Sequence, residues 1–293
     1  EEASGTKYVP QELMETWSNR DPLKNFETFL CSKNILTKQQ ITDASEEFKE
    51  EINEHLQIAF DEETIKVDLT SELKDVYKEY QQEIIVPSNQ KSNIRLIDAI
   101  SKGLRESMER YDNLIIMGQD VAEYGGVFKI TEGFANQFGR DRVRNTPICE
   151  SAIVSAAYGA SLNGMKAVME MQFADFVSSG FNPIVNLLAK SNYRWNQNAD
   201  VVIRMTCGAG VGAGPLHSQT NEAWFTKTPG LKVIYPAFPE DAKGLLCAAI
   251  NDPNPVLFFE HKALYRSIYQ DVSDDYFTVE IGKASVLKEG SDI

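Results

Sequence analysis

Residues 146–163 read TPICESAIVSAAYGASLN, and this stretch decides how the rest of the chain is interpreted. It places one carboxylate, Glu150, at the start of a predicted helix that consists mostly of small residues. The small residues are Ser151, Ala152, Ser155, Ala156, Ala157, Gly159, Ala160 and Ser161. Side chains of this size allow another backbone or a flat ligand to approach closely. Glu150 is therefore a candidate functional residue, although an acid in the first helical turn is also favoured by the helix dipole alone.

Apolar runs and helical patterns alternate through residues 93–270. The expected strands cover residues 114–117, 166–171, 201–205, 231–235 and 255–260, and the expected helices begin near residues 93, 150, 176 and 240. This alternation predicts an α/β fold in which a mostly parallel sheet carries helices on both faces. Such sheets bind ligands beyond the carboxyl ends of their strands, so the loops after residues 117, 171 and 205 are the expected site loops.

The first 92 residues are predicted to form a helical extension and a linker. Residues 1–90 carry a net charge of −11, most of the −14 of the whole chain. Thr37 and Gln40 form a capping-box pattern, and the apolar residues behind them recur at helical spacing, which predicts an amphipathic helix of about 20 residues. A short helix is expected near residues 73–80. We place domain boundaries at about residues 92 and 270, and residues 271–293 are predicted to begin a further unit with a strand at 282–287.

Composition disfavours several classes of partner. Nucleic acids and anionic membrane surfaces require basic patches, which this acidic chain lacks, and no apolar run approaches the roughly 18 residues of a membrane span. Four widely spaced cysteines and three histidines disfavour a zinc site and are typical of a reducing cytoplasm. Because the chain opens on Glu1 rather than Met, we expect it to be part of a longer protein.

Two further loops carry candidate chemistry. Residues 208–213 (GAGVGA) fit a dinucleotide fingerprint, but Pro215 follows at once and no long apolar helix begins there, so a nicotinamide or flavin dehydrogenase is a minor alternative. His217 follows this loop and is a candidate for proton transfer, with a surface or capping histidine as the alternative. Gln172, Asp175 and Phe176 follow an expected strand, where polar and aromatic residues are also common for structural reasons.

Five ordered motifs resemble the beta subunit of the decarboxylating components of 2-oxoacid dehydrogenases, most closely the branched-chain (2-oxoisovalerate) type. The motifs are residues 117–128 (MGQDVAEYGGVF), 144–150 (RNTPICE), 172–176 (QFADF), 217–219 (HSQ) and 229–233 (PGLKV). Residues 5–60 resemble the tail of the alpha subunit of the same enzymes, through Tyr8-Val9-Pro10, Trp17, Arg20-Asp21-Pro22, Phe26-Glu27 and Leu30. The resemblance implies a parent protein in which an alpha-type part is fused to a beta-type part.

The resemblance implies thiamin diphosphate as the coenzyme and assigns roles to four residues. Glu150 matches the glutamate that hydrogen-bonds the aminopyrimidine ring, Phe176 an aromatic position close to that ring, and Gln172 a nearby polar position. His217 matches a histidine that faces the substrate and assists acyl transfer to a lipoyl group. The implied reaction is oxidative decarboxylation of a branched-chain 2-oxoacid with acyl transfer to a lipoyl domain. Pyruvate dehydrogenase, a transketolase-like enzyme and a non-catalytic α/β binding module are the alternatives.

The resemblance also implies metals and partners. A potassium site would be formed by Ala199, Val201, Ala249, Asp252 and Asn254, whereas the magnesium site belongs to an alpha part outside this chain. The expected partners are an alpha-type diphosphate-binding domain fused in the parent, a second copy in a homodimer or a two-alpha two-beta assembly, and a lipoyl acyltransferase. Because the diphosphate-binding part is missing, we expect this chain alone to be inactive.

Overall fold

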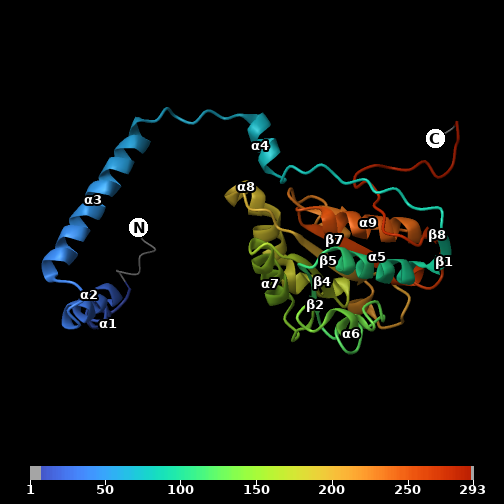
Figure 1. Cartoon of the computed structure of the whole chain (residues 1–293), viewed down its shortest axis with the longest axis horizontal. Helices are drawn as coiled ribbons and strands as arrows, with labels where there is room; N and C mark the ends of the chain where they lie inside the picture. The colour runs from blue at the N-terminus through green and yellow to red at the C-terminus, as the bar shows by residue number, and fades with distance from the viewer. Residues whose placement is uncertain (1–7, 292–293) are drawn as a thin grey trace. The chain divides into compact units, whose positions relative to one another are not determined.

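The computed structural model describes residues 8–291, which divide into two compact units between Val67 and Asp68 (Figure 1). The first unit contains helices α1 (Gln11–Ser18), α2 (Pro22–Ser32) and α3 (Lys38–Asp61). Thr37 Oγ1 accepts from the backbone of Gln40, whose side chain accepts from the backbone of Thr37, so the predicted capping box and amphipathic helix are confirmed. None of the described residues of this unit is buried.

The second unit is an α/β domain built on a six-stranded parallel sheet with the order β3-β2-β4-β5-β7-β6. The strands are β2 (Leu114–Gly118), β3 (Val143–Asn145), β4 (Lys166–Met171), β5 (Val201–Cys207), β6 (Lys232–Ile234) and β7 (Val256–His261). Helices α5 (Leu96–Arg110) and α9 (Pro239–Asn251) lie side by side over one face (Figure 1), and α7 (Glu150–Leu162) lies on the other. The predicted fold class is confirmed.

Two hydrophobic cores explain why the strands read as continuous apolar runs. Alternate strand residues face opposite layers: Val168 and Val202 pack with α5 and α9, whereas their neighbours Met169 and Ile203 pack with α7. Strands that are covered on both faces need apolar side chains at every position. The sheet therefore forms a rigid platform from which the loops at its carboxyl edge project.

The predicted boundary at residue 92 differs from the division observed between Val67 and Asp68. The predicted short helix lies earlier than expected, as α4 (Leu69–Asp75). The following residues are hydrogen-bonded along the α/β domain: Tyr77 Oη donates to Leu231 O at 3.1 Å, and Ile85 N donates to Thr278 Oγ1 at 2.8 Å. Residues 68–92 therefore belong structurally to the second unit, because their backbone groups are satisfied there.

Other local predictions differ from the structure in identifiable ways. The helix expected from residue 93 begins at Leu96, because strand β1 (Lys91–Arg95) first pairs antiparallel with β8 (Tyr269–Ser273). The helix expected from residue 176 is a series of short turns: η2 (Ala174–Gly180), η3 (Pro183–Leu187), η4 (Leu188–Lys190) and α8 (Ser191–Trp195). Residues 282–287 are irregular rather than a strand, and helix α6 (Phe134–Phe138) was not predicted. No helix within residues 8–291 is long and apolar enough to span a membrane.

Candidate functional site

The carboxyl end of β2 positions Glu150. Thr146 N donates to Gly118 O at 2.9 Å, which ties the loop before α7 to the last residue of the strand. Helix α7 then begins at Glu150, as predicted, and the half-buried carboxylate accepts from Gln119 Nε2 at 3.3 Å. Gln119 lies one residue beyond β2 and was not predicted as a site residue. The helix start and the strand end thus fix one carboxylate at the edge of the sheet.

An edge-to-face aromatic cluster forms a second part of the site. The rings of Phe173 and Phe176, on the segment after β4, have centroids 5.7 Å apart. The imidazole of His217 lies 4.8 Å from the Phe173 ring at 85° and 5.5 Å from the Phe176 ring at 82°. The structure therefore brings together Phe176 and His217, which are 41 positions apart in the sequence. Edge-to-face contacts of this kind hold the imidazole in a defined plane.

Asp175 anchors the loop that carries His217. Its side chain is only 7% exposed, and its Oδ1 accepts from Ser218 N and from Gln219 N, each at 3.1 Å. Since these are the two backbone amides that follow His217, the buried carboxylate fixes the end of η5 (Pro215–His217) against η2. Sequence reasoning noted Asp175 only as a polar residue at a strand end.

Lys262, in η7 (Lys262–Leu264) after β7, places a buried amine behind the aromatic cluster. Its Nζ has no hydrogen-bond partner among the described residues and lies 5.2 Å from the centroid of Phe173. Burial lowers the pKa of Lys262, and interactions with Cys207 and Asp175 partly oppose this shift. Burial raises the pKa of the Cys207 thiol to about 11, so that thiol stays protonated and is not a nucleophile at neutral pH.

Gln172 lies on the loop side of the same strand end. Its Nε2 donates to Asp120 Oδ2 at 3.4 Å, and its backbone oxygen accepts from Thr206 Oγ1 at 2.5 Å. The amide is thus held between the ends of β4 and β5 and the loop after β2. Its contact with a coenzyme stays a prediction.

Comparison with known proteins decides the family. A family model described as "Transketolase, pyrimidine binding domain" matches residues 92–267, and one described as "Dehydrogenase E1 component" matches residues 2–68. The chain belongs to the transketolase pyrimidine-binding domain family. It is 48% identical over 199 residues to the 2-oxoisovalerate dehydrogenase subunit beta of Bacillus subtilis, a match that covers 67% of this chain and 61% of that protein.

Other relatives agree with this assignment. The pyruvate dehydrogenase E1 component subunit beta of Bacillus subtilis is 42% identical over 206 residues, covering 69% of this chain and 63% of that protein. A solved structure described as "Split gene transketolase, inactive beta4 tetramer" matches with a TM-score of 0.55 and 23% identity, over 68% of this chain and 60% of that one, and supports the fold alone. The chain thus spans less than two thirds of these curated relatives. The predicted resemblance, with an E1-type segment before a pyrimidine-binding domain, is confirmed.

A buried ionic cluster underlies the site edge of the pyrimidine-binding domain. Arg204 on β5 donates from Nε and Nη2 to the two carboxylate oxygens of Glu260 at 2.8 and 2.9 Å, and from Nη1 to Glu170 Oε2 at 2.8 Å. Tyr265 Oη donates to Glu260 at 2.6 Å. Burial raises the pKa of Glu170, although the charge of Arg204 opposes this shift. The cluster links the ends of β4, β5 and β7 beneath the loops.

The predicted potassium ligands are engaged within the domain. Lys232 Nζ forms an ion pair with Asp252 Oδ2, and Asp252 Oδ1 accepts from the backbone and side chain of Asn254, each at 2.9 Å. Asn254 Oδ1 accepts from Lys78 N at 2.7 Å. Among the predicted backbone ligands, Ala199 O accepts from Val201 N at 2.8 Å. The side-chain oxygens as arranged do not fit a cation, and potassium stays a prediction.

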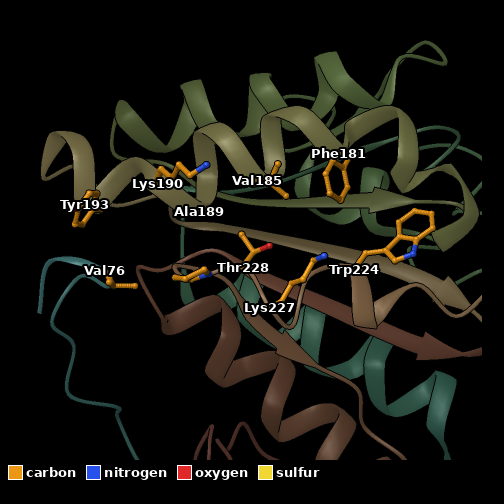
Figure 2. A pocket seen from close by; sticks show the side chains of 10 residues that line it. Val76, Phe181, Val185, Ala189, Lys190, Tyr193, Trp224, Lys227 and Thr228 are labelled. Carbon is orange, nitrogen blue, oxygen red and sulfur yellow. The ribbon is translucent and has the colours of Figure 1, made fainter. Parts of the chain in front are cut away.

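The domain also carries an apolar groove of about 580 Å³ that contains none of the predicted site residues. Figure 2 shows Phe181, Val185 and Tyr193 on one side of the groove, facing Trp224 and Thr228 on the other. The groove offers apolar surface but contains neither the Glu150 carboxylate nor the His217 imidazole. Glu150, Phe176 and His217 stay the predicted site residues.

Proposed function

We propose that this chain supplies the pyrimidine-binding part of a thiamin diphosphate-dependent 2-oxoacid dehydrogenase. The observation that carries the proposal is the placement of the Glu150 carboxylate at the first turn of α7, within hydrogen-bond distance of Gln119. The Phe176–His217 pair provides the flat apolar wall and the titratable group on the neighbouring strand end. A half-buried carboxylate at a helix start fits a protonatable ring nitrogen, and the aromatic ring of Phe176 fits a planar heterocycle.

Each residue has a defined task in this proposal. Glu150 would accept a hydrogen bond from a ring nitrogen of the aminopyrimidine and hold its proton, and Phe176 would contact the ring. Gln172 would orient a polar substituent nearby. When bound, thiamin diphosphate supplies the electron sink that decarboxylation requires. His217 would face the substrate and move a proton during acyl transfer to a lipoyl group.

The proposed metal and partners come from the relatives of this chain. Residues 8–291 contain no group of three or more His, Cys, Asp or Glu side chains that could hold a metal ion. We propose that magnesium and the diphosphate are bound by an alpha-type domain that is fused to this sequence in the parent protein. A lipoyl acyltransferase is the proposed acyl acceptor, and the cytoplasm the proposed location.

A branched-chain 2-oxoacid is the proposed substrate, and pyruvate is the second candidate. The 2-oxoisovalerate dehydrogenase relative shares 48% identity, against 42% for the pyruvate dehydrogenase relative. The test is turnover by the parent protein with thiamin diphosphate and magnesium, with 2-oxoisovalerate and pyruvate offered separately and an artificial electron acceptor reduced. Preference for 2-oxoisovalerate supports the proposal, and activity with pyruvate alone would reassign the substrate.

A substitution at Glu150 distinguishes the enzyme proposal from the alternative of a non-catalytic binding module. Glu150→Gln keeps the shape of the side chain but removes the proton-holding carboxylate, so turnover should fall by about 10²–10⁴-fold. Glu280→Gln is the matched control, because Glu280 pairs with Lys283 at 3.2 Å on the surface, outside the site. A parent protein that is folded but inactive with both substrates would favour the binding module.

The small-residue helix also supports an assembly. Ser151, Ala152, Ser155 and Ala156 are exposed on α7, whereas Ile153 and Val154 are buried. We propose that this face contacts a second copy or an alpha-type domain. Sedimentation of the chain at tens of micromolar tests self-association, and a strict monomer would contradict it.

A further inference from the structure

Asp175 Oδ2 and His217 Nδ1 are buried polar atoms beside the aromatic cluster that, like Lys262 Nζ, have no hydrogen-bond partner among residues 8–291. An ionised carboxylate can only accept hydrogen bonds, whereas a neutral imidazole carries one nitrogen that donates and one that accepts. A buried polar atom that stays unpaired costs about 1–3 kcal/mol. The two atoms are not hydrogen-bonded to each other in the structure, but they are complementary, so one hydrogen bond between them would satisfy both.

The backbone already holds the two side chains on adjacent segments. Asp175 Oδ1 accepts from Ser218 N and Gln219 N at 3.1 Å, so the carboxylate lies against the backbone that directly follows His217. The imidazole lies edge-on to Phe173 and Phe176, the residues that flank Ala174 and Asp175. Hydrogen bonds of catalytic groups are often long before the ligands are in place and shorten when the site is assembled.

We propose that Asp175 is the positioning residue of His217: its Oδ2 accepts the Nδ1 proton of the imidazole and thereby fixes the tautomer of the ring. Nδ1 is the buried nitrogen and His217 as a whole is half-buried, so the opposite edge of the ring, with Nε2, is directed outward. The tautomer set by Asp175 leaves the lone pair on Nε2, where it can take a proton from a reacting group. A third group orienting a base in this way recurs in enzymes.

Lys262 contributes a buried amine next to the same aromatic cluster. Its buried Nζ lies near the Phe173 ring and interacts electrostatically with Asp175. A carboxylate buried to this extent is stable as an anion only with compensating donors or charge. The backbone amides of Ser218 and Gln219 donate to one oxygen of the Asp175 carboxylate, which leaves the other oxygen to accept from His217.

The pairing is tested on this chain directly, by nitrogen-15 NMR of the imidazole rings. The sequence contains only three histidines, so a histidine-labelled sample gives three ring patterns, and His217→Gln identifies the pattern of interest. At about pH 8, where an ordinary imidazole is neutral, we expect the proton of His217 on Nδ1. In Asp175→Asn the amide nitrogen takes the place of Oδ2 and donates instead, so the proton should move to Nε2.

An exposed aspartate provides the control for the NMR experiment. Asp112→Asn changes an exposed aspartate outside the site and should leave the His217 pattern unchanged. A His217 proton on Nε2 in the unsubstituted chain would overturn the pairing, and this result does not depend on the Asp175→Asn variant. An identical tautomer in the unsubstituted and Asp175→Asn chains would overturn it as well.

The consequence for turnover rests on the proposed function, whereas the tautomer does not. In the parent protein, Asp175→Asn should lower lipoyl-dependent turnover by roughly 10²–10⁴-fold, because His217 would present N–H instead of a lone pair. Turnover with the artificial acceptor should change much less, since it does not require acyl transfer to the lipoyl group. A parent protein inactive in both assays would contradict the proposed function, and the NMR result would still decide the pairing.

Discussion

Substitution of Gly230 tests how tightly the two sides of the pyrimidine-binding domain are joined near the start of β6. Gly230 has φ +90°, and a Cβ built on it would lie 1.8 Å from the backbone oxygen of Ala189 in η4. Real Cβ contacts are essentially never below 3.0 Å, so Gly230→Ala requires a backbone displacement of more than an ångström. The left-handed conformation costs about 1–2 kcal/mol for an alanine, and forcing the backbones apart adds about 1–3 kcal/mol.

The matched control separates these two contributions. Gly133 has φ +80° but nothing within 4 Å of its built Cβ, so Gly133→Ala should lose only the conformational part, about 1–2 kcal/mol. Urea unfolding should therefore show Gly230→Ala less stable than Gly133→Ala by about 2 kcal/mol, a midpoint difference of about 1 M. Tryptophan fluorescence suits the assay, since Trp195 and Trp224 lie in this domain. Equal midpoints for the two variants would refute the argument from close approach.

Two further predictions concern buried charge. Burial raises the pKa of Asp200 to about 6, despite its 2.8 Å ion pair with Lys166. The folded chain therefore holds the Asp200 proton more tightly than the unfolded chain does, and its free energy of unfolding falls as pH rises from about 4 through 6. Asp200→Asn lacks this titration, so between pH 4 and 7 its free energy of unfolding should rise by about 3 kcal/mol relative to that of the unsubstituted chain. Urea unfolding at a series of pH values tests this, and an unchanged difference between the two chains would contradict it. Glu260→Gln should cost about 3 kcal/mol, because Glu260 accepts two hydrogen bonds from the buried Arg204. Glu170→Gln should cost less, because Glu170 accepts only one hydrogen bond from Arg204 and burial already raises its pKa. Equal losses in urea unfolding would contradict this difference.

The sequence predicted the parts of the fold that local patterns determine. The small-residue run begins at Glu150 and α7 does the same, and β4 covers the expected residues 166–171. β3 was not predicted because its three residues, Val143–Asn145, contain a single apolar side chain and form no apolar run. The course of residues 77–88 was not predictable from local patterns, because their hydrogen-bond partners lie more than 150 positions along the chain.

The site shows the same division between local and distant determinants. Glu150 and His217 were identifiable one at a time, since each follows a recognisable loop or helix start. Asp175 and Lys262 were not, because their significance depends on which elements the sheet brings to one edge: η2 follows β4 and η7 follows β7. Parallel strands deliver all their carboxyl ends to the same edge, so polar residues from distant segments meet there whatever their spacing. A polar residue at such a strand end should therefore be judged by the buried partner atoms it faces. One oxygen of Asp175 is bound to the loop that carries His217, and the other has no donor within residues 8–291. By that criterion Asp175 is a stronger candidate for a role in the chemistry than its sequence context indicated.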